Sequence, residues 1–295
     1  MNTDPVNVEQ NVFKPLHLRP KKTIALAEFL ELSAKFYGFD SQAVRKFDSL
    51  YCNGKRLRFQ NLTDDFLLST EDLIKVFPRP KRFSLEVLSL ESILYEDQNL
   101  LAIDKPKGLP SIPVASNATE NCKAFFEAKL QQPLLPLHRL DELTCGVLLF
   151  AKNTQTVRQF QKDHLIGRIQ KIYRTLVSKP LSLGRYEHYL LKGRGRMLVF
   201  DGPVSGGKLC RLEINKRRGL EDRTRLDIKL ITGRTHQIRA QLSHLGSPIL
   251  GDPIYSSSSD IQDFYLCARQ VTWNGLKIQS QMSGYTQKPK PTCIS

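Results

Sequence analysis

The chain has 295 residues, of which 40% are hydrophobic, so it can bury a sizeable core in one large domain or two smaller ones. It carries 44 Lys and Arg against 29 Asp and Glu, a formal net charge of +15. Such an excess attracts polyanions such as nucleic acids, and also anionic membrane surfaces. However, no apolar run is long enough to cross a bilayer, and Asp4 and Glu9 stand where a secretory signal would be apolar.

The cysteine and histidine patterns argue against disulfides and metal ligands. There are six residues of each type, and neither forms a CxxC pair or another cluster with zinc-ligand spacing. Scattered single cysteines favour reduced thiols, as in the cytosol or nucleus. We therefore predict a cytoplasmic protein without a metal site. The cysteines are Cys52, Cys122, Cys145, Cys210, Cys267 and Cys293.

The first residues are expected to form an irregular arm, residues 1–22, and then two helices. The arm is polar and interrupted by proline. A helix is predicted from Thr23 to Gly38, because apolar residues recur at helical spacing and glycine is a common stop. Ser41 is predicted to cap the second helix. The inward side chains of the first helix are expected to be Leu26, Phe29, Leu30 and Tyr37.

A short strand and a linker complete this first domain, residues 1–82. Asn53-Gly54 is typical of a tight turn. Residues 73–77 are apolar enough for a short strand, and residues 78–82 alternate proline with basic residues, as linkers do.

The second domain, residues 83–295, alternates short apolar strands with helices. Strands are predicted at residues 100–103, 147–151, 172–177 and 226–231, the last because apolar and polar residues alternate. Helices are predicted at residues 154–165, capped by Thr154, and 238–245, ended by Gly246. Because helices interrupt the strands irregularly, we expect an α+β domain with a mixed, mostly antiparallel sheet.

Positive charge is concentrated in residues 185–239, which carry 14 basic and 6 acidic side chains. A charge run is usually a solvated face, but this density favours contact with nucleic acid. The glycine-rich run Asp201–Lys208 lies within this segment. It lacks the Gly-Lys-Ser/Thr ending of a phosphate-binding loop, so we expect a hairpin loop.

The most specific motif runs from His138 to Lys152. It reads His-Arg-Leu-Asp, two spacer residues, Thr-Cys-Gly, four apolar residues and Ala-Lys. This pattern resembles the signature of the RluA-type RNA pseudouridine synthases, which isomerise uridine in RNA and have serine at the place of Cys145. The resemblance implies that Asp141 is the catalytic carboxylate.

Further matches extend this resemblance to residues 94–273. The last strand reads Leu266-Cys267-Ala268 where the family typically has Leu-His-Ala, a second departure. The other matching segments are Tyr95–Leu109, Lys171-Ile172-Tyr173, Gly233–Arg239 and Leu245–Tyr255. The resemblance implies a pseudouridine synthase fold.

A weaker resemblance concerns the first domain. Gln42–Arg45 and Asn53–Lys55 are similar to parts of the small RNA-binding domain named for ribosomal protein S4, which often precedes this catalytic domain. The alternative is a generic helical cap on the second domain.

The resemblance also implies roles for individual residues in the chemistry. An arginine beside a carboxylate keeps it ionised and oriented; Arg234 matches that partner, although it could instead contact phosphate. Tyr173 matches a tyrosine that stacks on the base and relays a proton, although a core aromatic is the alternative. Whether Asp141 attacks the sugar or the base, or acts as a base, stays open.

Substrate-binding roles follow from the need to take the uridine out of its stack. Arg139 resembles the residue that braces the vacated space. His236 is predicted to support the site, with a core or capping histidine as the alternative, and Leu266 to contact the substrate. The chemistry involves no net redox change, so no cofactor is expected.

We therefore predict an RNA pseudouridine synthase that acts on ribosomal or transfer RNA without a membrane or an obligatory protein partner. One alternative is a catalytically silent RNA-binding protein on the same fold. Another is a metal-dependent phosphodiesterase, which the missing ligand spacing argues against.

Overall fold

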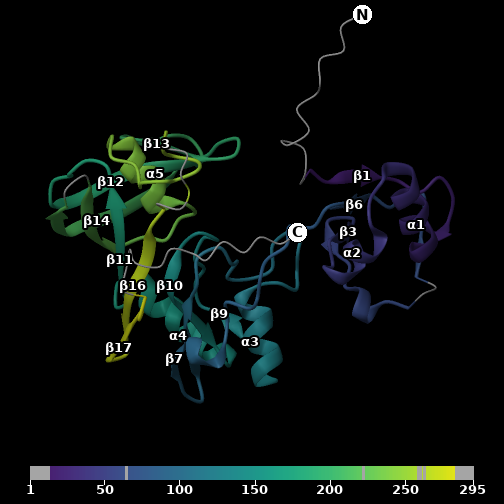
Figure 1. The fold of residues 1–295 in the computed structure, drawn as a ribbon, viewed down its shortest axis with the longest axis horizontal. Helices are drawn as coiled ribbons and strands as arrows, with labels where there is room; N and C mark the ends of the chain where they lie inside the picture. The colour runs from purple at the N-terminus through teal and green to yellow at the C-terminus, as the bar shows by residue number, and fades with distance from the viewer. Residues whose placement is uncertain (1–13, 64–65, 221–222, 258–260, 262–263, 283–295) are drawn as a thin grey trace, which may run out of the picture. The chain divides into compact units, whose positions relative to one another are not determined.

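The computed structural model describes residues 14–63, 66–220, 223–257, 261 and 264–282 (Figure 1). The chain forms two compact units, the first of residues 1–85 and 112–130 and the second of residues 86–111 and 131–295. The segment 112–130 thus groups with the N-terminal unit, whereas the sequence assigned it to the second domain. Within the described residues, no helix is long and apolar enough to cross a membrane.

The first unit consists of short strands and three helices. Its strands are β1 (Leu16–Leu18), β2 (Ile24–Ala25), β3 (Leu50–Cys52), β4 (Lys55–Arg56), β5 (Leu67–Leu68) and β6 (Ile74–Val76). Its helices are α1 (Leu26–Tyr37), α2 (Ser41–Lys46) and α3 (Cys122–Leu130), with a short 3-10 helix at Phe59–Asn61. One sheet has the order β1-β6-β3-β4, and β2 pairs with β5.

Some predictions for this unit are confirmed and others need correction. Gly38 ends α1 in the left-handed conformation. However, α2 is capped by Asp40 rather than Ser41, because the Asp40 carboxylate accepts hydrogen bonds from two backbone N–H groups of the first turn. Tyr37 is exposed rather than inward. The predicted arm contains β1, and its residues 1–13 lie outside the described part of the chain.

The second unit is built on one large sheet. Its strands are β7 (Ile93–Glu96), β8 (Leu100–Lys105), β9 (Leu135–Pro136), β10 (Cys145–Ala151), β11 (Gln170–Val177), β12 (Gly184–Lys192), β13 (Met197–Phe200), β14 (Lys208–Gly219), β15 (Thr224–Leu230), β16 (Leu266–Trp273) and β17 (Leu276–Gln279). Its helices are α4 (Thr154–Leu165), α5 (Gln237–His244) and a 3-10 turn at Leu90–Ser92.

The sheet order is β13-β12-β14-β15-β11-β16-β10-β8-β7, with β17 on β16 and β9 on β10. Only the β10–β16 pair is parallel among the described strands, which confirms the predicted α+β class with a mostly antiparallel sheet. The glycine-rich run connects β13 to β14, which both pair with β12, so it is a strand connection and not the loop of a hairpin.

The two helices cover different parts of the sheet. Phe160 of α4 packs on a buried cluster that includes Leu100 and Val147 of the central strands. This helix is capped by Asn153, not by the predicted Thr154. Ala240 of α5 packs against β12 and β14. Helix α5 thus lies against the part of the sheet formed by β12, β13 and β14, whereas α4 lies near β10 (Figure 1).

The parallel pairing of β10 and β16 depends on Gly146. This residue has φ +104, and a Cβ atom here would lie 2.4 Å from the carbonyl oxygen of Ala268 on the neighbouring strand. Both the backbone conformation and the close approach therefore require glycine.

Gly146→Ala is expected to lower the free energy of unfolding by about 3–5 kcal/mol, because strain at positive φ adds to a backbone clash. The control is Gly167→Ala, which also has positive φ but nothing within 4 Å of the new atom. It should cost only about 1–2 kcal/mol. Urea unfolding of both variants measures the difference, and equal losses would contradict the packing argument.

Candidate active site

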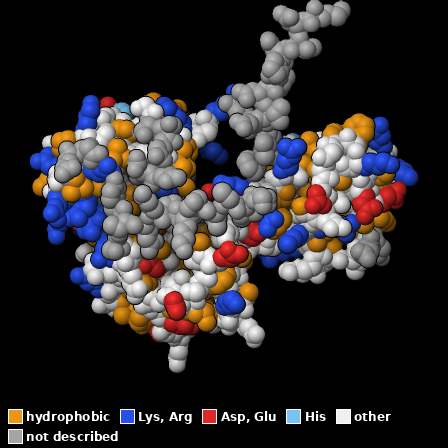
Figure 2. Space-filling view, in the orientation of Figure 1, with side chains coloured by type: hydrophobic (Ala, Val, Ile, Leu, Met, Phe, Trp, Pro, Cys, Tyr) orange, Lys and Arg blue, Asp and Glu red, His pale blue; other side chains and the backbone are white. Residues whose placement is uncertain are grey.

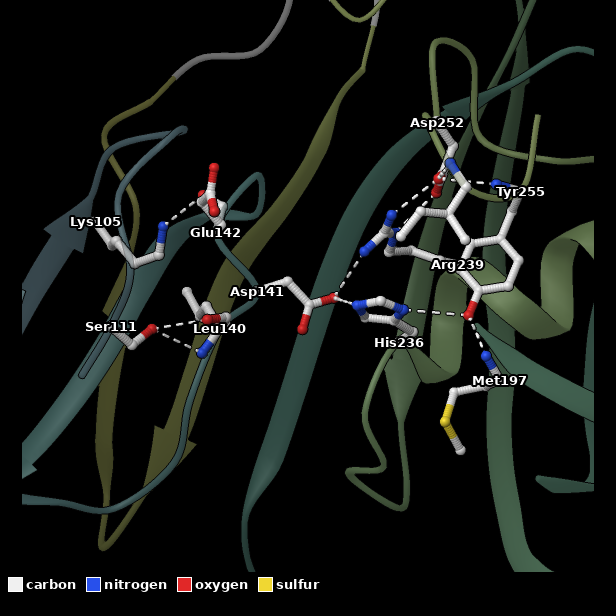
Figure 3. Close-up of polar contacts among 11 residues, drawn as sticks. Lys105, Ser111, Leu140, Asp141, Glu142, Met197, His236, Arg239, Asp252 and Tyr255 are labelled. Atoms are coloured by element: carbon white, nitrogen blue, oxygen red, sulfur yellow. Dashed lines mark hydrogen bonds and ion pairs between the residues drawn. The ribbon is translucent and has the colours of Figure 1, made fainter. Parts of the chain in front are cut away.

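Asp141 lies in the loop between β9 and β10, and hydrogen bonds fix the residues on both sides of it (Figure 3). The Ser111 hydroxyl accepts from Leu140 N at 3.0 Å and donates to Leu140 O at 2.8 Å. The buried Lys105 ammonium donates to the carbonyl oxygen of Glu142 at 3.1 Å. The end of β8 and the segment after it thus anchor the loop. Their side chains bind the backbone of Leu140 and Glu142 and so set the position of Asp141.

The Asp141 carboxylate points toward α5 and the loop before it (Figure 3). Its Oδ2 accepts a hydrogen bond from a terminal nitrogen of Arg239 at 3.4 Å and lies 3.9 Å from Nε2 of His236. The Asp141 side chain is 29% exposed and that of Arg239 only 4%. One carboxylate oxygen is therefore held by a buried cation, while the group stays accessible to a substrate.

Arg239 is itself fixed by the buried Asp252. Nε of Arg239 donates to Oδ2 of Asp252 at 2.8 Å, and a terminal nitrogen donates to Oδ1 at 2.9 Å. The guanidinium also lies over the rings of Tyr255 and Phe264. Burial acts to lower the pKa of Arg239, but the hydrogen bonds and charge of Asp252, together with Asp141, outweigh it and raise that pKa. The cation is thus permanent.

The prediction that Arg234 is the partner of Asp141 is wrong, because Arg239 makes that contact. Arg234 is exposed in the loop before α5, and its Nε donates to the carbonyl oxygen of Leu209 at 3.4 Å. The helix begins only at Gln237, and its buried side includes Arg239. The sequence did contain a signal for this. Arg239 lies three residues before the apolar Leu242, and residues at that spacing share one face of a helix.

His236 supports the carboxylate from the other side. It adopts the left-handed conformation, φ 53, immediately before α5. Its Nδ1 lies 3.2 Å from the hydroxyl of Tyr255, which accepts a hydrogen bond from Met197 N at 2.8 Å. Burial lowers the pKa of His236, with the charge of Asp141 acting in the opposite direction. A neutral ring that accepts the Tyr255 hydrogen at Nδ1 presents Nε2–H toward Asp141.

The other predicted residues lie on the strands and the loop around Asp141. Tyr173 on β11 is buried, and burial, followed by the nearby charge of Asp141, raises its pKa above the ordinary value. Leu266 is buried at the start of β16, which pairs with β11. Arg139 is exposed on the same loop, two residues before Asp141. Of these three residues, Tyr173 lies close enough to Asp141 to be affected by its charge, and Arg139 shares its loop.

The two departures from the family motifs lie side by side. Cys145 and Cys267 are register partners in the parallel β10–β16 pair, and both are buried. The Cys145 thiol donates to Leu266 O at 3.6 Å, and its pKa is raised, first by its hydrogen bond with Cys267 and then by burial. A buried thiol that stays protonated is no nucleophile, so Cys145 has a packing role.

Comparisons with known proteins identify the family of this chain. Residues 99–244, which include Asp141, Tyr173 and Arg239, match the family model described as RNA pseudouridylate synthase. An uncharacterised RNA pseudouridine synthase of Mycoplasma pneumoniae is 30% identical over 238 residues, covering 75% of this chain and 73% of that protein. The chain belongs to the RNA pseudouridine synthase family. Members of this family are isomerases, and the predicted family is confirmed.

Other family members share shorter parts. The chloroplastic RNA pseudouridine synthase 6 of Arabidopsis thaliana is 29% identical over 62% of this chain, and the match covers 44% of that protein. Ribosomal large subunit pseudouridine synthase D of Borreliella burgdorferi is 30% identical over 56% of this chain and 54% of its own length. The chain thus spans about half the length of these two relatives.

A solved structure supports the fold. The human RNA pseudouridylate synthase domain containing 4 aligns with 64% of this chain and 87% of its own chain, with a TM-score of 0.51 and 22% sequence identity. The second unit therefore has the pseudouridine synthase fold.

Variants of the two arginines test which one is the structural partner of Asp141. Arg239→Gln leaves the buried Asp252 without its cation and is expected to lower the free energy of unfolding by about 3–5 kcal/mol. Arg234→Gln, at an exposed position, should change it by no more than about 0.5 kcal/mol. Denaturant titrations measure both free energies of unfolding. A larger loss for Arg234→Gln than for Arg239→Gln would contradict the assignment of Arg239 as the structural partner of Asp141.

Proposed function

We propose that this chain isomerises specific uridines to pseudouridine in structured RNA, with Asp141 as the carboxylate at the reaction centre. The observation that carries the proposal is the Asp141 side chain, partly exposed on an anchored loop and held at one oxygen by the buried Arg239. Family membership supplies the reaction class.

The reaction breaks the bond between the ribose and a ring nitrogen and rejoins the ribose to a ring carbon. No electrons are gained or lost, so the protein must supply a negative charge, an orientation and a path for one proton. Asp141 supplies the negative charge, and Arg239 orients it through one carboxylate oxygen. This holds whether the carboxylate attacks the sugar or the base.

Tyr173 is proposed to handle the proton that leaves the ring carbon. Because its pKa is raised, the hydroxyl stays protonated across the ordinary pH range and can exchange a proton without carrying a lasting charge. Its ring also offers a flat surface for the extracted base.

Three further side chains are proposed to bind the substrate. The exposed Arg139 is suited to brace the RNA where the uridine leaves its stack. Leu266 lines the site from β16, and His236 orients Asp141 through its Nε2. Arg234 is exposed in the loop before α5 and is proposed to contact a phosphate of the RNA, which is the alternative role that its sequence allowed.

The RNA is proposed to lie on the basic surface of the second unit. Figure 2 displays Lys and Arg side chains gathered over the edge of this unit where β14 runs. Lys216, Arg217 and Arg218 on β14 are exposed, as are Arg194 and Arg196 in the turn between β12 and β13. Ribosomal or transfer RNA is the proposed substrate, in keeping with the name of the Borreliella relative.

The first unit is proposed to be an accessory RNA-binding domain. Its helix pair α1–α2, the turn at Asn53-Gly54 and the late strand β6 follow the order expected of the ribosomal-protein-S4-type domain. A cytoplasmic location is likewise proposed, on the scattered cysteines without pairing motifs.

Asp141→Asn is expected to reduce turnover on uridine-containing RNA to background, because the amide has neither the charge nor the nucleophilicity of the carboxylate. RNA binding should remain within about tenfold, since phosphate contacts supply most of the affinity. The matched control is Glu142→Gln, the neighbouring carboxylate on the same loop. Multiple turnover by Asp141→Asn would remove Asp141 from the reaction centre and favour another residue. Absence of turnover in the wild type would favour the silent RNA-binding alternative.

Exchanging Arg194, Arg196, Arg217 and Arg218 for glutamine should flatten the salt dependence of RNA binding. For every phosphate that an arginine no longer neutralises, the slope of log K against log salt is expected to fall by about 0.7–0.9. Filter binding over a range of salt concentrations measures the slope. The double variant Arg158→Gln with Lys162→Gln, on an exposed side of α4, controls for half of that loss of charge. An unchanged slope in the fourfold variant would place the RNA elsewhere.

A further inference from the structure

A second cluster of polar side chains lies in the catalytic unit, apart from the residues that contact Asp141. It combines His188 of β12, Asp201 directly after β13, and His244 at the end of α5. Nε2 of His244 lies 2.7 Å from Oδ1 of Asp201, and Nε2 of His188 lies 3.8 Å from the same oxygen. One ligand atom of each residue lies within 4.8 Å of the other two.

The separations suit a tetrahedral metal ion. Zinc binds imidazole nitrogen and carboxylate oxygen at about 2.0–2.2 Å, which puts neighbouring ligand atoms about 3.4 Å apart. The separations of 2.7 and 3.8 Å from the Asp201 oxygen to the two histidine nitrogens lie on either side of that value. The side chain of His188 is 7% exposed and fixed, whereas those of Asp201 and His244 are 82% and 31% exposed and have room to adjust. Closing the cluster around an ion thus requires movement only of the two outer side chains.

Gln241 supplies an independent observation. It is fully buried, its side-chain nitrogen lies 2.8 Å from Nδ1 of His188, and its Oε1 has no hydrogen-bond partner among the described residues. A half-turn of this amide exchanges its oxygen and nitrogen, so that Oε1 can accept the Nδ1 hydrogen of His188. The lone pair of His188 Nε2 then faces Asp201 and His244. Metal-binding histidines are typically oriented by such a partner on the other ring nitrogen.

We propose that His188, Asp201 and His244 bind one divalent transition-metal ion, with zinc as the best match to two imidazoles and a carboxylate and with water as the fourth ligand. The ion would join β12, the β13–β14 connection and the C-terminal end of α5. His244 follows Arg239 by five residues, about 7.5 Å along the helix. The site therefore holds the far end of the helix that carries Arg239, and its existence does not depend on the uridine chemistry.

Titration calorimetry of the full, untagged chain with zinc chloride, after removal of bound metal by a chelator, tests the proposal. We expect saturable binding of one ion per chain. Asp201→Asn and His244→Gln should each weaken that binding by about tenfold or more, and Gln241→Leu by about 10–100-fold. The matched control, His17→Gln on the exposed strand β1, should leave it unchanged. Circular dichroism verifies that the exposed-site variants are folded.

Cobalt(II) provides a second readout of the same site. A four-coordinate cobalt ion absorbs visible light far more strongly than a six-coordinate one, so an intense visible band that disappears in Asp201→Asn supports the site. A weak, hydrate-like spectrum overturns it. Absence of saturable zinc binding, or equal binding by the wild type and Asp201→Asn, also overturns it and leaves a hydrogen-bonded His–Asp–His cluster.

Discussion

The buried ion pair between Arg239 and Asp252 is the interaction on which the candidate active site depends. Asp252 is inaccessible to solvent and accepts both hydrogen bonds of a fork-like contact, so the guanidinium has one orientation. Its remaining terminal nitrogen is thereby directed at Asp141. A buried pair of this kind adds little net stability, because desolvation offsets the attraction, but removing either partner is costly. Its value here is the geometry that it imposes on a more exposed carboxylate.

The loop that carries Asp141 meets this arrangement from the opposite direction (Figure 3). Ser111 and Lys105 hold the backbone on both sides of Asp141, and Gly146, shortly after this loop, lets β10 approach β16 closely. The carboxylate is therefore placed by two rigid supports, the sheet and α5, which meet only in the tertiary fold. A candidate metal ion at the other end of α5 would stiffen the second support without touching the substrate.

Local patterns predicted the elements well wherever the period of the apolar residues was clear. The strand at Leu100–Lys105, the helix ended by Gly38 and the alternation along Thr224–Leu230 appear as expected. The caps of α2 and α4 lie one residue earlier than predicted, because Asp40 and Asn153 precede the hydroxyl residues that were predicted to cap. The prediction that the first helix begins at Thr23 is wrong, because Ile24–Ala25 pairs with β5 as a strand and α1 begins at Leu26. The grouping of residues 112–130 with the first unit was not predictable, since it depends on long-range contacts that leave no local period.

By itself, the sequence determined the family, the α+β class and the identity of the candidate carboxylate, because the motif around Asp141 is a local string of residues. The tertiary structure alone decided that Arg239 rather than Arg234 faces this carboxylate, since the start of α5 selects which arginine points inward. It also brought together His188, Asp201 and His244, which are too far apart in the chain to form a ligand pattern. Side chains on separate elements become neighbours only when sheet pairing and helix packing fix their distances, and no spacing along the chain records that.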